Sequence, residues 1–485
     1  MSNTLSISAL YTWGQFTPAF CLVGLAVLLL LADAFFPRVS KQVYPVAGAI
    51  GAFLVGLCLL VGEHTAYFDS LACFATALCL LLAFDYRSVV YDSVGGSGEE
   101  DGAAEFAALP LIACAGICAL TVARDIIMLF VSLETVTLAS YALAGYFRRN
   151  QGSIEAGVKY LILGALSTGI FVFGAAWYFG MVGSFLLAPE LVWPALNSPY
   201  LCTGVLVAFA MLMLGAFFKV GAAPMHSWIP DVYQGSPTPV SAFLAVASKI
   251  AGFVLLLHIC TPLVQMVHAY APLIAPIIFG LSVVTALTLL IGNLGAIRQS
   301  NVKRLLGYSS IGQAGFIMVF FVSMGSTLFT DVCYYLLAYG LATIPAFYAI
   351  AQVRMQRGSE EISAFRGLAK TNPRTAALIA VSFASLAGVP LTGGFMAKFK
   401  SFCALVYAQH RWDFSCWGLL IIMVICAAAG FYYYFKVLRA MYWETPQEGD
   451  APVKFSPLAT AVLAISAAAL IALGTLPLIT AHVLL

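Results

Sequence analysis

Charged residues are scarce in this sequence. They make up 9% of the 485 residues, against about 25% in soluble domains, while hydrophobic residues make up 62%. This balance excludes an ordinary soluble domain and predicts a chain that crosses a lipid bilayer many times. The net charge of +2 gives no basis for nucleic-acid binding. The first residues, MSNTLSISAL, include no basic stretch, so we expect no cleaved signal peptide.

Motifs that hold metals or cofactors are also missing. The twelve cysteines are scattered, with no CxxC pair and no Cys/His cluster at metal-binding spacing. Neither a Walker loop nor a GxGxxG turn between a strand and a helix occurs. We therefore expect no metal and no cofactor in this chain. Cys114 and Cys118 share a helix face, and we interpret all the cysteines as small apolar core residues.

Apolar segments long enough to cross a bilayer, which takes about 20 residues per helix, are abundant. They predict an all-α polytopic membrane protein with about fourteen transmembrane helices. In chain order the segments lie near 10–36, 44–63, 67–86, 104–122, 125–147, 155–181, 200–219, 238–264, 270–296, 303–323, 327–353, 374–401, 415–441 and 456–484.

Two of these helices contain helix-breaking residues at matching places. Helix seven has a break near Gly221–Pro224, and helix twelve has one at Gly388–Pro390, followed by Gly393–Gly394. Helices 4–8 and 9–13 therefore read as two five-helix repeats, which must be inverted because five is odd. Broken helices in inverted repeats are typical of transporters. The predicted units are 1–103, 104–264, 265–445 and 446–485.

Positive charge predicts how the helices are oriented. Sixteen of the 23 Lys and Arg residues fall in loops after odd-numbered helices, and only Arg124 and Arg411 fall in loops after even-numbered ones. The positive-inside rule places the first set of loops, including 87–103 and 354–374, in the cytoplasm. Both termini, Ser2 and Leu485 among them, are then expected on the opposite side.

A few charged residues lie inside the apolar segments, where an unpaired charge is costly and usually functional. Glu134 is near the middle of helix five, Lys219 precedes the first break, Lys249 is deep in helix eight, and Lys398 follows the second break. A desolvated ammonium gives up its proton more readily, so these groups predict a proton relay across the membrane. The alternative is that Glu134 only locks two helices together, and that the lysines extend towards the membrane surface. Lys159, four residues after Glu155, suits either an interfacial ion pair or a place in the relay.

Several motifs resemble one known family. They are SLETVTLASYALAGYFRR, EAGVKYLILGALSTGIFVFG, FKVGAAPMHSWIPDVYQGSPTPVSAFLAVASKIAGF, GNLGAIRQSNVKRLLGYSSIGQAGF and SLAGVPLTGGFMAKF. Together they resemble subunit N of respiratory complex I, one of the three antiporter-like membrane subunits of proton-translocating NADH–quinone oxidoreductase. The resemblance covers nearly the whole chain and is weakest in the first hundred residues.

The resemblance implies a role for each buried charge. Glu134 and Lys219 would form the switching ion pair, and Lys249 would be the central lysine of the channel. Lys398 would stand near the exit on the far side, and Lys159 would match the family's helix-six lysine.

The step between Lys249 and Lys398 has no histidine of the kind that the sibling subunits carry. Helix eleven, DVCYYLLAYGLATIPAF, offers tyrosines instead. The predicted linkers are water and the side chains of Tyr334, Tyr335, Tyr339, Ser309 and Ser310.

The resemblance also implies a setting. It predicts a non-redox subunit of an NADH–quinone oxidoreductase, multi-pass in the bacterial inner membrane, with both termini on the periplasmic side. Its partners would be the lipid bilayer, protons and the other membrane-arm and peripheral-arm subunits. NAD, flavin, iron–sulfur clusters and quinone are expected in those partner subunits.

Other functions fit the same residues. The chain could serve a cation/proton antiporter without any redox partner, or the equivalent subunit of a photosynthetic, ferredoxin-dependent complex. A purely structural helix bundle is disfavoured, because the intramembrane lysines outnumber the mid-membrane carboxylate Glu134.

Overall fold

The computed structural model describes residues 12–36, 38–62, 66–86, 102–198, 200–409, 412, 416–446 and 452–476. Within these ranges the chain forms eighteen α-helices and two short 3-10 helices, and no β-strand. The predicted all-α fold is confirmed. Most of the predicted 87–103 loop and both terminal positions, Ser2 and Leu485, lie outside the described residues.

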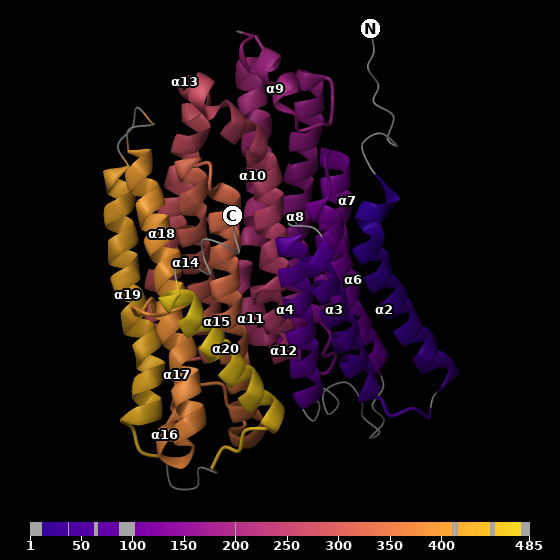
Figure 1. The fold of residues 1–485 in the computed structure, drawn as a ribbon, viewed down its shortest axis with the longest axis vertical. Helices are drawn as coiled ribbons and strands as arrows, with labels where there is room; N and C mark the ends of the chain where they lie inside the picture. Colours follow the sequence, from indigo (N-terminus) through magenta and orange to yellow (C-terminus); the bar gives the residue numbers. More distant parts are fainter. Residues whose placement is uncertain are drawn as a thin grey trace.

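Thirteen described segments are long and apolar enough to cross a membrane, and the broken pair α17 and α18 supplies one more crossing. The predicted number of about fourteen is therefore confirmed. Figure 1 shows these helices side by side, with their long axes roughly parallel. They are α2 (Thr17–Phe35), α3 (Val43–Gly62), α4 (Tyr67–Asp85), α6 (Ala103–Thr121), α7 (Ile126–Ala144), α8 (Gln151–Val182), α10 (Cys202–Val220), α12 (Thr238–Ala245) with α13 (Ala247–Ile297), α14 (Val302–Ser323), α15 (Leu328–Arg357), α17 (Pro373–Ala387), α18 (Gly393–Ala408), α19 (Trp417–Tyr442) and α20 (Pro457–Thr475).

Helix α13 differs from the predicted pattern. The sequence predicts separate helices over 238–264 and 270–296, but the helical backbone runs without interruption from Ala247 to Ile297. A straight helix of this length would extend about 77 Å, more than twice the hydrocarbon thickness of about 30 Å. Two apolar spans therefore supply two crossings: Thr238–Val267, which is α12 with the start of α13, and Ala271–Ile297. Pro262, Pro272 and Pro276 lie around the junction between them. The short interruption at Val246, between α12 and α13, was not predicted.

Both predicted helix breaks are confirmed, and they have the same backbone geometry. Gly221 ends α10 with φ of 81°, and Gly388 ends α17 with φ of 91°, a left-handed conformation that favours glycine. At each break the N–H groups of the glycine and of the next residue donate to one carbonyl, that of Phe217 or of Ala384. The chain resumes as α11 (Trp228–Gly235) and as α18. The repeat boundaries and the inverted relation stay predictions.

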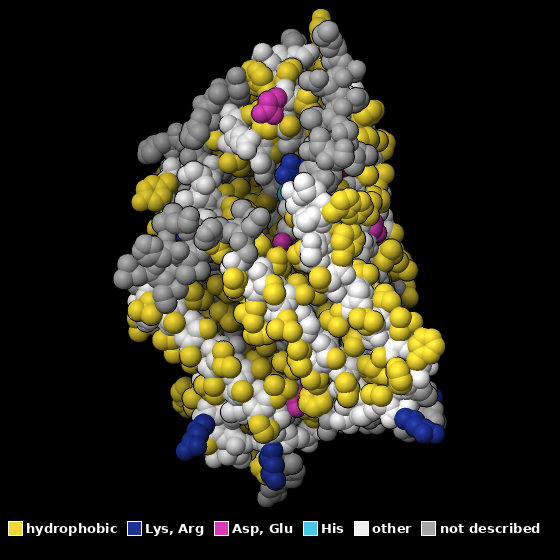
Figure 2. All heavy atoms as spheres, turned by 45° about the vertical axis from the view of Figure 1, so that its right-hand side comes forward, with side chains coloured by type: hydrophobic (Ala, Val, Ile, Leu, Met, Phe, Trp, Pro, Cys, Tyr) yellow, Lys and Arg dark blue, Asp and Glu magenta, His cyan; other side chains and the backbone are white. Residues whose placement is uncertain are grey.

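Burial differs strongly between the helices. Residues 238–257 are buried throughout, and α14 and α15 are mostly buried, whereas α2, α8 and α19 expose many apolar side chains. Figure 1 places α2 and α19 at opposite ends of the molecule. Figure 2 shows hydrophobic side chains over most of one face, with Lys and Arg along its lower edge. This is the surface expected of a protein surrounded by lipid.

The close approach of α13 to α14 depends on glycine. A Cβ on Gly292 would lie 2.2 Å from the backbone nitrogen of Gly312, whereas a Cβ on Gly280 of the same helix would meet nothing within 4 Å. Gly292→Ala is therefore expected to lower the free energy of unfolding by about 1–3 kcal/mol, because the helices must separate. The measurement is the thermal midpoint of the purified chain in detergent, with Gly280→Ala as control. Equal midpoints for the two variants would contradict this packing.

Candidate functional site

Glu134 lies near the middle of α7, which begins where Asp125 accepts a hydrogen bond from the backbone N–H of Met128. Its carboxylate is partly buried and accepts a hydrogen bond of 2.8 Å from the hydroxyl of Thr168 on α8. The resemblance implies an ion pair with Lys219, but no contact ion pair joins these two described side chains. The two side chains are therefore not in direct contact, and the Glu134 carboxylate is held by the Thr168 hydroxyl.

Lys219 lies in the last turn of α10 and is 3% exposed. Its Nζ donates to the Tyr160 hydroxyl at 3.1 Å and to the Ser248 hydroxyl at 3.4 Å. The Tyr160 ring stacks on Trp228, whose indole N–H donates to the carbonyl of Phe218 at 3.0 Å. Trp228 thus ties the start of α11 to the end of α10. The break is held in place by aromatic packing around the lysine.

Lys249 follows Ser248 and is 1% exposed. Its Nζ donates to both the carbonyl and the hydroxyl oxygen of Ser310, each at 2.5 Å, and lies 5.4 Å from the centre of the Tyr339 ring. The Ser310 hydroxyl also contacts the hydroxyl of Tyr233 at 3.2 Å. The Ser248 hydroxyl thus accepts from Lys219, and the Ser310 hydroxyl accepts from Lys249, the residue that follows Ser248 in the chain.

A small cavity lies between Tyr339 and the second break. It has room for about one water molecule, and Gln313, Tyr335 and Leu386 are among the residues that line it. The Gln313 amide donates to the Leu386 carbonyl at 3.0 Å and to the Tyr434 hydroxyl at 3.1 Å, and it accepts from Tyr335 at 2.5 Å. Neither Gln313 nor Tyr434 was among the residues predicted from the sequence. The one signal available was an amide inside the apolar stretch IGQAGF.

Lys398 lies one turn into α18 and is 9% exposed. Its Nζ donates to the carbonyls of Leu386 and Ala387, both at 2.9 Å, and lies 5.0 Å from the centre of the Phe316 ring. These carbonyls belong to the last turn of α17, where a helix leaves its carbonyls unpaired and partly negative. The broken helix therefore builds a site for a cation at its own interruption.

Not all of the five predicted linkers lie between Lys249 and Lys398. Tyr335 and Tyr339 line the cavity, and Ser310 accepts from Lys249. Ser309 hydrogen-bonds to Tyr434. Tyr334 is different. Its hydroxyl donates to the carbonyl of Leu473 at 3.0 Å, and its ring lies 4.9 Å from the Nζ of Lys400.

Lys400 also forms an ion pair of 3.1 Å with Asp331. Tyr334 and Lys400 thus belong to a contact that is separate from Lys398. Lys400 is two residues after Lys398 on α18, and residues two apart on a helix point in different directions.

Lys159 takes part in a network near the surface. Its Nζ lies 2.6 Å from Glu155 and 2.7 Å from Asp231, and its side chain is 41% exposed. Arg304 pairs with the same Asp231 at 2.6 Å. The expected Glu155–Lys159 pair is present, and these contacts join α8, α11 and α14 rather than the buried lysines.

One buried ion pair was not predicted from the sequence. Lys303, which the sequence analysis counted among the cytoplasmic loop charges, has a fully buried side chain 3.2 Å from Glu360. Its Nζ also donates to the carbonyl of Ser236 at 2.7 Å. Burial opposes ionisation of Glu360, but the charges of Lys303 and Arg354 outweigh it and lower the pKa of this carboxyl. The pair anchors the loop after α15 against the ends of α11 and α14.

Known proteins are similar to this chain in sequence and in fold. The family described as "NADH:quinone oxidoreductase/Mrp antiporter, TM" matches residues 123–426. The chain is 34% identical over 423 residues to NADH-quinone oxidoreductase subunit N of a Geobacillus species, covering 82% of this chain and 84% of that one. It is 35% identical over 393 residues to the chloroplastic NAD(P)H-quinone oxidoreductase subunit 2 of Nephroselmis olivacea, covering 80% and 73%.

A solved structure is also similar. It is respiratory complex I from Thermus thermophilus with bound aureothin, in which one chain superposes with a TM-score of 0.78 and 30% identity. The similarity covers 96% of this chain and 99% of that chain.

Proposed function

This chain belongs to the NADH:quinone oxidoreductase/Mrp antiporter transmembrane family, and we propose that it translocates protons as the antiporter-like subunit N of a complex I. The observation that carries the proposal is the row of buried cationic side chains, Lys219, Lys249 and Lys398, each held by oxygen atoms. A buried ammonium is costly, so a bundle built only for packing would not keep three of them.

In the proposed relay the proton moves along the hydroxyl contacts. Glu134 stabilises a protonated Lys219 through space, and movement of the carboxylate away from the lysine favours release of that proton. Ser248 then leads to Lys249, which is held by Ser310. Beyond Lys249 the proton passes through the cavity beside Gln313 and reaches Lys398.

Quinone reduction in other subunits would drive this movement. We place NAD, flavin, iron–sulfur clusters and quinone in those membrane-arm and peripheral-arm partners, with no redox centre in this chain. We also place the protein in the bacterial inner membrane, with both termini on the periplasmic side. The bias of Lys and Arg towards loops after odd-numbered helices supports that orientation.

Two neighbouring lysines of α18 provide the test. Lys398→Met is expected to reduce proton uptake into vesicles about 100-fold, the size of effect seen when a positioned proton-transfer group is lost. Lys400→Met should keep most of the uptake, because Lys400 pairs with Asp331 and not with the relay. Uptake and quinone reductase activity are measured together, in vesicles with matched amounts of assembled complex.

The two lysines have different expected outcomes, so the result is decisive. Equal, near-normal uptake in both variants would show that Lys398 only caps the end of α17 and carries no proton. Uptake that needs a sodium gradient and no quinone would assign the chain to a cation/proton antiporter instead.

A further inference from the structure

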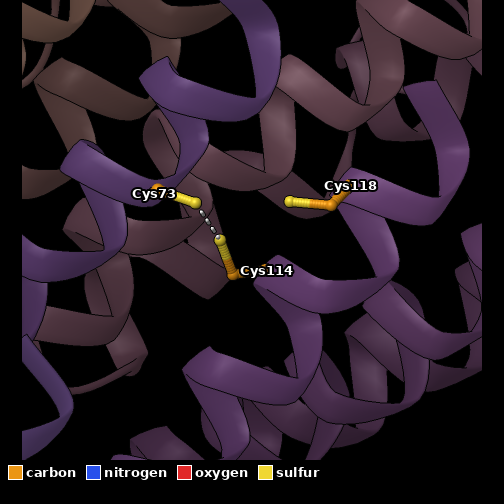
Figure 3. Close-up of side chains that lie close together, drawn as sticks. All are labelled: Cys73, Cys114 and Cys118. Carbon is orange, nitrogen blue, oxygen red and sulfur yellow. Dashed lines mark hydrogen bonds between the residues drawn. The ribbon is translucent and has the colours of Figure 1, made fainter. Parts of the chain in front are cut away.

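Three cysteines from two helices meet inside the bundle. Cys73 is on α4, while Cys114 and Cys118 are one turn apart on α6, and all three are at most 2% exposed. Their sulfur atoms lie within 4.8 Å of one another, and the Cys73 and Cys114 sulfurs are 3.7 Å apart. Figure 3 shows the three side chains pointing towards a common centre.

This spacing suits one atom bonded to all three sulfurs. With bonds of about 2.3 Å, as in metal–thiolate sites, the sulfurs around a three-coordinate atom lie about 3.5–4 Å apart. Small side-chain rotations would bring the cluster into that range. His, Asp and Glu side chains of the described residues add no fourth ligand to the group. The site is therefore built for three-coordination.

Electrostatics decides which element the site takes. The sulfurs project from the interiors of α4 and α6, where backbone N–H groups are already bonded within the helices and cannot stabilise thiolate charge. A monovalent or divalent metal ion held by three thiolates leaves net negative charge in an apolar interior, which is costly. A trivalent element held by three thiolates leaves none.

We propose that Cys73, Cys114 and Cys118 form a membrane-buried trithiol site for a trivalent thiophilic element that arrives uncharged, as arsenous acid does. One arsenous acid molecule reacts with three thiols to give one arsenic tris-thiolate and three water molecules. Three As–O and three S–H bonds break, while three As–S and three O–H bonds form. Arsenic stays in the +3 state, so no oxidant or reductant takes part.

The product ties α4 to α6. Both the entering molecule and the product are neutral, so neither step moves a charge through the apolar interior. The site is independent of the proposed proton relay, and its readout is binding, which does not depend on proton translocation.

The test uses the purified full-length chain in detergent. The chain is incubated with arsenite, passed through a desalting column, and assayed for arsenic by mass spectrometry. One arsenic atom per chain is expected. Peptide mapping after maleimide treatment in denaturant should find Cys73, Cys114 and Cys118 protected together with arsenite and modified without it. Cys118→Ser should retain less arsenic by more than about tenfold, since even changes outside a ligand set reduce affinity by about 10- to 100-fold.

A matched control is Cys260→Ala, which removes a fully buried cysteine that belongs to no such group. It should bind arsenic like the unaltered chain. The mapping on the unaltered chain gives an answer even if a variant misfolds. Equal arsenic retention by Cys118→Ser, or modification of the three cysteines despite arsenite, would overturn the proposal. Retention of copper or zinc in place of arsenic would overturn it as well.

Discussion

Lys249→Met is expected to reduce proton translocation about 100-fold in a complex that still assembles. Methionine has a similar length and is apolar, so it fits a site that is 1% exposed without leaving a cavity. It removes the one ammonium that the Ser310 carbonyl and hydroxyl hold between Lys219 and the cavity near Gln313. The relay would then lack its central protonatable group.

The measurement is proton uptake into vesicles, divided by the content of assembled complex. Lys436→Met is the control, because that lysine donates to the carbonyl of Gln299 and lies outside the chain of buried contacts. Quinone reduction in the Lys249→Met complex should fall along with uptake if the two are coupled. Uptake above half of the normal value would place the central step elsewhere.

Much of the fold was predictable because it depends on local sequence. A bilayer requires about 20 apolar residues per crossing, so hydropathy alone delimits most helices to within a few residues. The two breaks were predictable for a similar reason. Gly221 and Gly388 adopt a left-handed conformation that few other residues tolerate, and each is followed within a few residues by proline.

Other features depend on contacts between distant parts of the chain. Gln313 and Tyr434 are 121 residues apart in the sequence, and no periodicity in either helix indicates that they meet. Lys303 looked like a loop charge, because nothing near it in the sequence shows that Glu360 folds back to cover it. Residue type identified the lysines as unusual, but only packing shows which oxygen atoms hold them.

The hydrogen-bond partner of Glu134 is the clearest example of a contact that the sequence did not predict. The sequence and the resemblance favour an ion pair with Lys219, whereas the carboxylate accepts its hydrogen bond from Thr168. A carboxylate that a neutral hydroxyl holds can move without first breaking a contact ion pair. The observed arrangement therefore suits the proposed switching role at least as well as a closed pair would.

Glu134→Gln separates charge from contact. The glutamine amide oxygen can still accept the hydrogen bond from Thr168, so the helix contact between α7 and α8 is kept while the negative charge is lost. We expect proton uptake to fall about tenfold or more, because Lys219 loses the charge that stabilises its protonated form. The measurement is uptake per assembled complex, and Thr168→Val is the control, because it keeps the charge and removes the hydrogen bond. Its effect should be much smaller.

Lys219→Arg tests whether Lys219 must release a proton or only supply a positive charge. Arginine keeps the positive charge and can still donate to Tyr160 and Ser248, but its guanidinium does not release a proton in the working range. Uptake should therefore fall as far as in Glu134→Gln, although the charge balance of the site is unchanged. If Lys219→Arg pumps normally while Glu134→Gln does not, then Lys219 serves only as a fixed charge. If both variants pump normally, Glu134 and Lys219 are structural residues.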